Sequence, residues 1–370
     1  MEPNGSRSAR YPGLMLEQAS QPLAPLTTLR VGGPARRMVT ASTEQEIVET
    51  AKDCDKRGEP LLVLAGGSNL VIADKGFDGT VLRIATSGVH KQKTCSGMRI
   101  GVAAGHVWDE FVAEAVEIGA VGVEALSGIP GSTGATPIQN VGAYGQEVSQ
   151  SVAWIRALDR TTGEIRGMQS RCLDFGYRDS VFKAHPDRYI VLTVWFGFEP
   201  AAAQRADRLS APVKYAELAR MLGIAEGERA PLTAVREAVL GLRAGKGMVL
   251  DEQDHDTWSA GSFFTNPIID LAVYDALAAG ASAAASPPRF DAPDGRVKTS
   301  AAWLIDQAGF ARGYGTGRVT LSTKHTLALT NRGGATTDEL LTLAREIRDG
   351  VRARFGVELV AEPILVGTAL

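Results

Sequence analysis

Residues 128 to 147 read GIPGSTGATPIQNVGAYGQE, and this stretch is the main guide to the structure expected in the first half of the chain. Five glycines and two prolines fall within this stretch, and neither a helical nor a strand period runs through it. A loop of this length inside a compact domain is usually functional or disordered. Its low charge and its apolar Ile129, Ile138 and Val141 argue against disorder, and several free N–H groups would suit a pyrophosphate. The stretch predicts an ordered loop around an extended ligand, which composition alone does not name.

A second glycine-rich segment, AGGSNLVI at 65 to 72, follows the predicted strand EPLLVLA at 59 to 65. Gly66 and Gly67 would let backbone N–H groups approach a phosphate without a Cβ in the way. The segment has neither the GK[ST] of a P-loop nor the GxGxxG that begins a Rossmann unit. A plain tight turn remains the alternative for this segment.

The rest of the chain alternates helical and strand patterns, which predicts an α+β (mixed α/β) protein. Capping boxes at Thr43-x-x-Glu46 and Thr336-x-x-Glu339 predict helices that end at Gly58 and Gly356. A third, amphipathic helix is expected over 107–119, with Trp108, Phe111, Ala115 and Val116 on one face. The predicted strands are GTVLRI (79–84), MRIGVAAG (98–105), SVAWIRALDR (151–160), YIVLTVWFGF (189–198) and VELVAEPILVG (357–367).

Composition excludes several classes of protein. With 370 residues, two or three domains are expected, and a net charge of -3 offers no footprint for nucleic acid or an anionic membrane. The three cysteines, Cys54, Cys95 and Cys172, lack metal-ligand spacing, so we expect no metal, no disulfide framework and a cytoplasmic setting. No apolar run reaches the roughly 18 residues of a membrane helix. Residues 1–20 are expected to be a flexible tail.

Six segments occur in the order typical of one enzyme family. They are TTLRVGGPA (27–35), LAGGSNLVI (64–72), the stretch 128–147, FGYRDSVFK (175–183), GSFFTNP (261–267) and AEPILVG (361–367). The chain therefore resembles the UDP-N-acetylenolpyruvoylglucosamine reductases, also called UDP-N-acetylmuramate dehydrogenases, over roughly residues 25 to 368.

The resemblance implies a two-lobed FAD-binding domain of the vanillyl-alcohol-oxidase type and a C-terminal α/β substrate-binding domain. The expected boundaries are 21–86 for lobe 1, 87–247 for lobe 2 and 248–370 for the substrate domain. The implied reaction is NADPH-dependent reduction of enolpyruvyl-UDP-N-acetylglucosamine to UDP-N-acetylmuramate, a step of peptidoglycan precursor synthesis. The substrate is a small sugar nucleotide, and a monomer is expected.

The resemblance also implies which residues hold FAD. Because no histidine or cysteine stands in an obvious attachment context, the FAD is expected to be non-covalent, with His106 acting as a helix cap. The cofactor-binding residues are expected to be Gly66, Gly67, Ser68, Asn69, Pro130, Gly131, Ser132, Thr133, Gly134, Gly142 and Gly145.

Three residues match the catalytic positions of the family. Ser262, in GSFFTNP, resembles its proton donor and would otherwise be read as a turn serine. Its hydroxyl could act as an acid only in a dry site, which we expect the rings of Phe263 and Phe264 to wall. Arg178 offers a planar fork that fits the carboxylate of the enolpyruvyl group. The matching glutamate, Glu362, is expected to join it there.

Four further residues are expected to bind substrate by resemblance: Tyr177, Tyr215, Lys246 and Asn266. Lys246 would meet phosphates or the nicotinamide dinucleotide. The sequence departs from the family at Thr265, where many members have lysine, and the segments 247–261 and 281–295 match no family pattern.

Two other classes compete with the reductase. Another flavoenzyme of the same FAD fold, such as a hydroxy-acid or sugar oxidase, would explain the glycine-rich loops but not Ser262, Arg178 and Glu362 together. A catalytically dead nucleotide-binding module should have lost one of these three side chains, and all three are present.

Overall fold

The computed structural model describes residues 16–94, 97–198, 208–281 and 286–370. Most of the expected tail and Cys95 lie outside these residues. The assignment of residues 16–20 to a flexible tail is wrong, because β1 (Leu16–Pro22) pairs antiparallel with β2 (Pro34–Ala41). Within the described residues, no helix is both long and apolar enough to cross a membrane.

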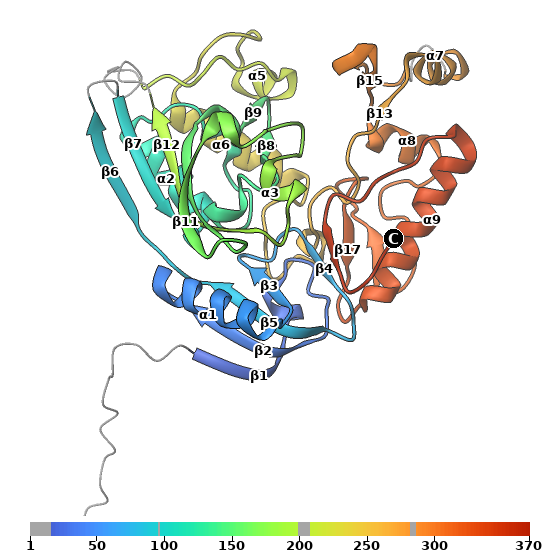
Figure 1. Cartoon of the computed structure of the whole chain (residues 1–370). Helices are drawn as coiled ribbons and strands as arrows, with labels where there is room; N and C mark the ends of the chain where they lie inside the picture. The colour runs from blue at the N-terminus through green and yellow to red at the C-terminus, as the bar shows by residue number, and fades with distance from the viewer. Residues whose placement is uncertain (1–15, 95–96, 199–207, 282–285) are drawn as a thin grey trace, which may run out of the picture.

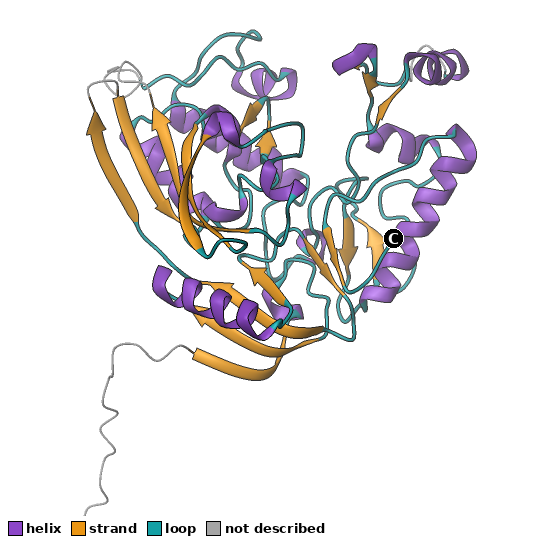
Figure 2. Ribbon diagram, in the orientation of Figure 1, coloured by secondary structure: helices purple, strands orange, loops and turns teal. Residues whose placement is uncertain are grey.

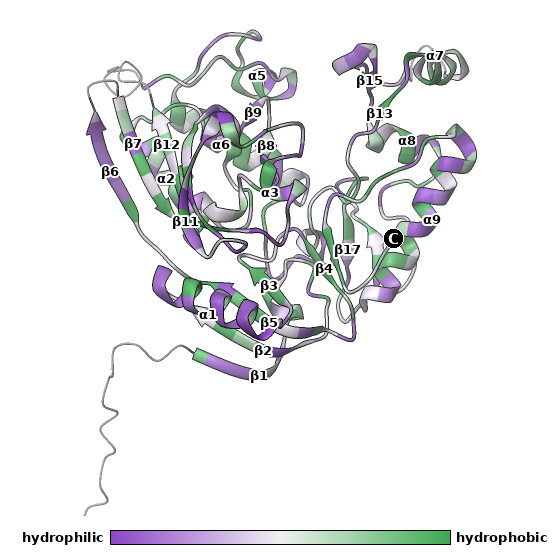
Figure 3. Cartoon of the chain, viewed as in Figure 1, coloured by the Kyte–Doolittle hydropathy of each residue, from purple (hydrophilic) through white to green (hydrophobic). Residues whose placement is uncertain are grey.

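A four-stranded sheet forms the first layer, at the bottom of the view in Figure 1. Its strand order is β1-β2-β5-β3, and β5 (Phe77–Ile84) pairs parallel with both β2 and β3 (Leu61–Leu64). The predicted capping box opens α1 (Glu44–Arg57), and Gly58 ends this helix in the left-handed region at φ 62°. Figure 3 shows α1 as mostly hydrophilic beside the hydrophobic strands β3 and β5, as expected for a helix with one buried face.

A second, fully antiparallel sheet follows in the chain and forms the large curved sheet of Figure 2. The amphipathic helix predicted over 107–119 is confirmed as α2 (Trp108–Ile118), and its Trp108 and Phe111 are fully buried. The strand order is β11 (Glu164–Gln169), β10 (Val152–Asp159), β12 (Tyr189–Phe198), β7 (Gly97–Ala103) and β6 (Val89–Thr94).

Residues 128–147 form the ordered, irregular loop that their composition predicts. They contain a 3₁₀ turn at Thr133–Ala135 and the short hairpin of β8 (Gly142–Ala143) and β9 (Gln146–Glu147). The short helix α3 (Val181–Ala184) lies between β11 and β12 in the chain, and α5 (Ala216–Leu222) and α6 (Leu232–Gly245) follow the second sheet.

The C-terminal part forms a separate hydrophobic core around α9 (Thr337–Phe355), whose predicted capping box is present. The other elements of this part are α7 (Leu271–Gly280), α8 (Ala301–Gln307), β13 (Ile268–Ile269), β14 (Phe290–Asp291), β15 (Val297–Lys298), β16 (Val319–Leu321) and β17 (Leu329–Asn331).

The chain then returns to the first part of the structure. The strand predicted over 357–367 is too long, because only β18 (Ile364–Val366) finds a partner, pairing parallel with β4 (Leu70–Ile72). This pairing places AEPILVG next to the glycine-rich turn at residues 65–69. Two segments of the predicted site, nearly three hundred residues apart in the sequence, therefore meet in space.

Candidate functional site

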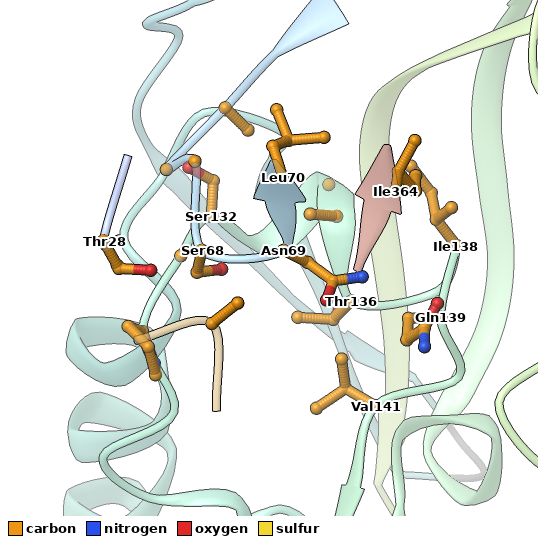
Figure 4. Close-up of a pocket in the computed structure, with 18 of the residues that line it drawn as sticks. Thr28, Ser68, Asn69, Leu70, Ser132, Thr136, Ile138, Gln139, Val141 and Ile364 are labelled. Atoms are coloured by element: carbon orange, nitrogen blue, oxygen red, sulfur yellow. The ribbon is translucent and has the colours of Figure 1, made fainter. Parts of the chain in front are cut away.

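A cavity of about 1220 Å³ lies where the two sheets and the C-terminal part meet. Its wall includes Ser68, Arg178, Ser262 and Glu362, each from a different segment of the chain. In the close-up of Figure 4, Thr28, Ser68 and Ser132 lie together on one side, and Asn69 and Gln139 lie toward the other. The cavity is large enough for a cofactor and a substrate side by side.

Glycine is required where the two glycine-rich segments touch. A Cβ on Gly66 would stand 2.5 Å from the Gly131 Cα, and one on Gly67 would stand 2.0 Å from the Leu26 carbonyl oxygen. Gly67 and Gly131 also have positive φ angles of 61° and 118°. The two segments therefore form a cradle whose backbones approach more closely than any side chain would allow.

The cradle offers neutral hydrogen-bond donors. Thr28 Oγ1 is buried and has no partner among the described residues, although Thr28 lines the cavity. Neither glycine-rich segment carries a lysine or arginine. Backbone N–H groups and hydroxyls would thus have to satisfy a bound diphosphate, and the residues present fit the diphosphate of FAD.

Most of the predicted cofactor residues line this cavity, and two do not. Thr133 is fully buried and donates its hydroxyl to the His106 carbonyl, and Gly145 also lies outside the cavity wall. The helix cap expected of His106 is wrong, because α2 begins after Val107 and no side chain caps it. The cavity wall includes the other nine: Gly66, Gly67, Ser68, Asn69, Pro130, Gly131, Ser132, Gly134 and Gly142.

Arg178 and Glu362 form an ion pair on the cavity wall. Arg178 Nε donates to Glu362 Oε1 at 2.9 Å, and Gln139 Nε2 donates to the same oxygen at 3.4 Å. Arg178 has φ 54°, a conformation that costs energy for a residue with a Cβ and often marks a functional position. The Lys183 ammonium holds the Arg178 carbonyl at 2.8 Å. The guanidinium is therefore fixed from both its backbone and its side chain.

Ser262 lies on the cavity wall beside this pair. The N–H of the next residue, Phe263, donates to the Leu327 carbonyl at 2.8 Å, and the Glu362 N–H donates to the Phe263 carbonyl at 2.8 Å. The expectation that Phe263 and Phe264 wall the cavity is wrong. Both residues are 1% exposed and belong to the hydrophobic core around α9, where close packing excludes them from solvent, and neither lines the cavity.

Charged and aromatic side chains gather around Lys246 on the cavity wall. Lys246 Nζ contacts Glu217 Oε2 at 2.5 Å and lies 5.7 Å from the centre of the Tyr144 ring. The Tyr144 and Tyr215 rings meet edge to face at 5.4 Å, and Tyr215 is 44% exposed. All of these except Glu217 line the cavity. This part of the wall has the charge and the stacking surfaces for a nucleotide.

Tyr177 and Asn266 stand behind the cavity wall instead of on it. The Asn266 side-chain oxygen accepts from the Ala301 N–H at 3.0 Å, at the start of α8. The pKa of Tyr177 is raised, chiefly by burial, and the Lys298 ammonium lies 4.4 Å from its ring centre. The structure therefore shows a structural contact for Asn266 and a packing role for Tyr177 beside Arg178.

Arg243 and His325 also line the cavity and lie outside the segments singled out from the sequence, whereas Gln139 and Tyr144 line it from within the predicted 128–147 loop. Burial, with the positive charges of Lys246 and Arg243, lowers the pKa of His325 to about 4. Its Nδ1 accepts the Leu327 N–H at 3.3 Å, so the proton of the neutral ring is on Nε2. Arg243 had a sequence signal, because it lies three residues before Lys246 in RAGK, and His325 had none.

Comparison with known proteins gives consistent matches. Residues 252–366 match the family model for the UDP-N-acetylenolpyruvoylglucosamine reductase C-terminal domain, and residues 35–168 match the FAD binding domain model. A curated UDP-N-acetylenolpyruvoylglucosamine reductase of Streptomyces coelicolor is 57% identical, covering 99% of this chain and 96% of the relative. A Mycobacterium tuberculosis relative of the same name is 51% identical, covering 94% and 95%.

Among solved structures, the chain is similar to the UDP-N-acetylenolpyruvylglucosamine reductase of Thermus caldophilus. The TM-score is 0.63 at 23% identity, with 95% of this chain and 99% of that chain covered. This likeness concerns the fold alone. It agrees with the two sheets and separate C-terminal core described above.

Proposed function

The chain belongs to the UDP-N-acetylenolpyruvoylglucosamine reductase family, and from this membership we propose that Ser262, Arg178 and Glu362 act on the substrate. The protein is an FAD-dependent oxidoreductase of peptidoglycan precursor synthesis that reduces UDP-N-acetylenolpyruvoylglucosamine with NADPH as hydride donor. Its FAD-binding domain is the two-lobed type of the vanillyl-alcohol oxidases. The dead-module alternative is set aside by the intact set of side chains.

Bound FAD would supply the hydride-transfer chemistry that links NADPH to the CH₂ end of the enolpyruvyl ether. We propose that the cradle of Gly66, Gly67 and Gly131 binds its diphosphate through backbone N–H groups. The free hydroxyl of Thr28 would donate there as well. These contacts exclude water from the diphosphate without adding positive charge.

Arg178 is proposed to bind the carboxylate of the enolpyruvyl group. The planar guanidinium can donate two parallel hydrogen bonds to a carboxylate, and its attraction strengthens as negative charge develops there. Glu362 orients the guanidinium through Nε, and Gly142 holds Nη2 by its carbonyl at 3.0 Å. These two contacts fix the direction in which the remaining N–H groups point.

Ser262 is proposed to donate the proton that completes the reaction. Addition of hydride to the CH₂ carbon leaves an aci-carboxylate, which needs one proton at the adjacent carbon. A serine hydroxyl is a weak acid, so it can serve only against a strongly basic carbanion and only when held in place. The backbone hydrogen bonds of Phe263 on both sides provide that support.

The observation that carries this proposal is the meeting of Arg178 and Glu362 beside Ser262 on one cavity wall. A flavin absorption spectrum, together with NADPH-dependent reduction of the enolpyruvyl sugar nucleotide, tests it. Oxygen consumption with a hydroxy acid or sugar in the absence of NADPH would instead favour an oxidase of the same FAD fold.

Tyr215 and Lys246 are proposed to bind the phosphates of the substrate, because both line the end of the cavity where Arg243 and His325 also lie. Loss of affinity for the sugar nucleotide in Lys246→Met, with NADPH reduction of the flavin retained, would support this assignment. Equal loss of substrate affinity and of flavin reduction by NADPH would instead assign Lys246 to binding of the nicotinamide dinucleotide.

We also propose domain limits of 21–86, 87–247 and 248–370, except that β1 belongs to the first domain. The two large sheets fall within the first two units, and the core around α9 falls mostly in the third, with Leu29, Val31 and Val71 contributed by the first. A cytoplasmic monomer is proposed as well. Light scattering of the purified protein and fractionation of cells would test these two points.

A further inference from the structure

Residues 251–257 form a polar turn directly behind the cavity wall. Asp256 in this turn is 5% exposed and does not line the cavity, whereas the following Thr257 and Ser259 do. The family resemblance assigns no role to this segment. A buried carboxylate six residues before the proposed proton donor, Ser262, therefore calls for a physical explanation.

The Asp256 carboxylate accepts hydrogen bonds from the loop at residues 322–327 and from Arg332, which follows this loop. Oδ1 accepts from the Thr323 N–H at 3.0 Å and from Arg332 Nη1 at 2.8 Å, and Oδ2 accepts from the Thr323 hydroxyl. Burial disfavours the ionised carboxylate, but these donors outweigh burial and lower the pKa of Asp256. The carboxylate thus stays ionised and binds strongly to the loop.

The same loop is bonded to the chain on the other side of Ser262. The Phe263 N–H donates to the Leu327 carbonyl at 2.8 Å. Two more hydrogen bonds hold the residues between Asp256 and Phe263. The Asn331 N–H donates to the Trp258 carbonyl at 3.0 Å, and the Gly261 N–H donates to Ser259 Oγ at 3.2 Å. The segment 256–263, which carries Ser262, is therefore fixed to one loop at both of its ends.

We propose that Asp256 is a positioning residue that fixes the Ser262 hydroxyl for proton donation by tying segment 256–263 to the 322–327 loop. This inference rests on the proposed role of Ser262. Without the Asp256 contacts, the segment would still be held at Phe263 and by the Asn331 N–H bond to the Trp258 carbonyl, but its first residues would be less restrained. Ser262 would then spend less time where its proton can be donated.

The experiment measures the two half-reactions separately in the full-length, FAD-loaded protein. Asp256→Asn keeps the side-chain volume but removes the charge that faces Arg332 and replaces one acceptor with a donor. We expect reoxidation of the reduced flavin by the enolpyruvyl substrate to slow roughly 10- to 100-fold, as for a misplacement on the order of 1 Å. Reduction by NADPH alone should stay within about twofold of wild type.

The same substitution is then made in the Ser262→Ala background. If Asp256 acts through Ser262, it should change reoxidation there by less than about threefold, because coupled residues are not additive. Equal slowing in both backgrounds would overturn the proposal by giving Asp256 another route of action. Wild-type reoxidation in Asp256→Asn would overturn it too, even where Ser262→Ala is slow and the role of Ser262 stands.

Near wild-type reoxidation in Ser262→Ala itself would instead overturn the role of Ser262 and, with it, this inference. The matched control is Asp159→Asn, since Asp159 is also buried and bonded to an arginine, Arg188, but lies in the second sheet. It should leave the ratio of the two half-reaction rates unchanged. If Asp256→Asn does not fold, Thr323→Val removes one hydroxyl donor to the carboxylate and should give the same selective slowing.

Discussion

Arg178 and Glu362 are 184 positions apart in the sequence, yet the Arg178 Nε donates to the Glu362 carboxylate at 2.9 Å. Their side chains are 21% and 16% exposed, so solvent still screens the pair and its contribution to stability is modest. Its importance is geometric. The pair connects the turn before α3 to the segment before β18 and fixes the direction of the guanidinium at the cavity.

Arg178→Lys should keep the charge but lose the planar fork. We expect turnover to fall by roughly 100-fold or more, comparable to removal of an oxyanion-site donor. Stopped-flow measurement should show reduction of the flavin by NADPH far less affected. Equal damage to both half-reactions would mean that Arg178 supports the fold or the cofactor instead.

Ser262→Ala removes one hydroxyl at nearly constant volume, so folding and FAD binding should survive. Reoxidation by the enolpyruvyl substrate should slow by several orders of magnitude, each tenfold loss raising the barrier by about 1.4 kcal/mol. Ser262→Cys should recover part of the rate, because a thiol also donates a proton. Reoxidation of the alanine variant within about tenfold of wild type would leave water or Glu362 as the proton source.

Gly66→Ala should abolish FAD binding, because its Cβ would stand 2.5 Å from the Gly131 Cα and force the cradle apart. The purified variant should be colourless and should not regain flavin absorbance on incubation with FAD. Gly280→Ala is the matched control, since a Cβ there meets no atom within 4 Å. Retention of FAD by Gly66→Ala would show that the two glycine-rich segments can separate without loss of the site.

His325 should make the protein less stable in acid. Its pKa is about 4 in the folded protein against 6.5 ordinarily, so the unfolded chain binds more protons between these values. The free energy of unfolding should therefore fall as pH drops from 6.5 toward 4, by at most about 3 kcal/mol. His325→Gln should lose this part of the dependence in urea unfolding at pH 7 and pH 5, and an unchanged dependence would assign it to other groups.

NADPH and the enolpyruvyl substrate should use the flavin in turn. Both must reach the same flavin nitrogen, and both are expected within the one cavity that Arg178 and Ser262 line. NADPH alone should bleach the flavin absorbance, and substrate added afterwards should restore it. A flavin that is reduced only when both ligands are present would contradict this order.

The sequence alone determined the features that depend on local geometry. Thr43 and Thr336 cap their helices through residues three positions away, so each capping box is complete within one turn. The same holds for α2, whose apolar spacing is a property of one helix. The glycines of residues 65–67 predicted a close backbone approach, and Gly66 does pack against Gly131 where a Cβ would not fit. Resemblance to a family added the roles of Ser262, Arg178 and Glu362.

Tertiary structure alone decided the features that need a distant partner. The apolar stretch after residue 357 forms a strand only at Ile364–Val366, where β4 supplies hydrogen-bond partners. The apolar rings of Phe263 and Phe264 could line a cavity or pack into a core, and the sequence does not distinguish these two placements. The packing around α9 places them in the core. His325 and Asp256 carry no sequence signal, because their burial and charge depend on residues far along the chain. The burial and the nearby charges of a side chain depend on the residues that pack against it in the fold, and these residues are distant from it in the sequence.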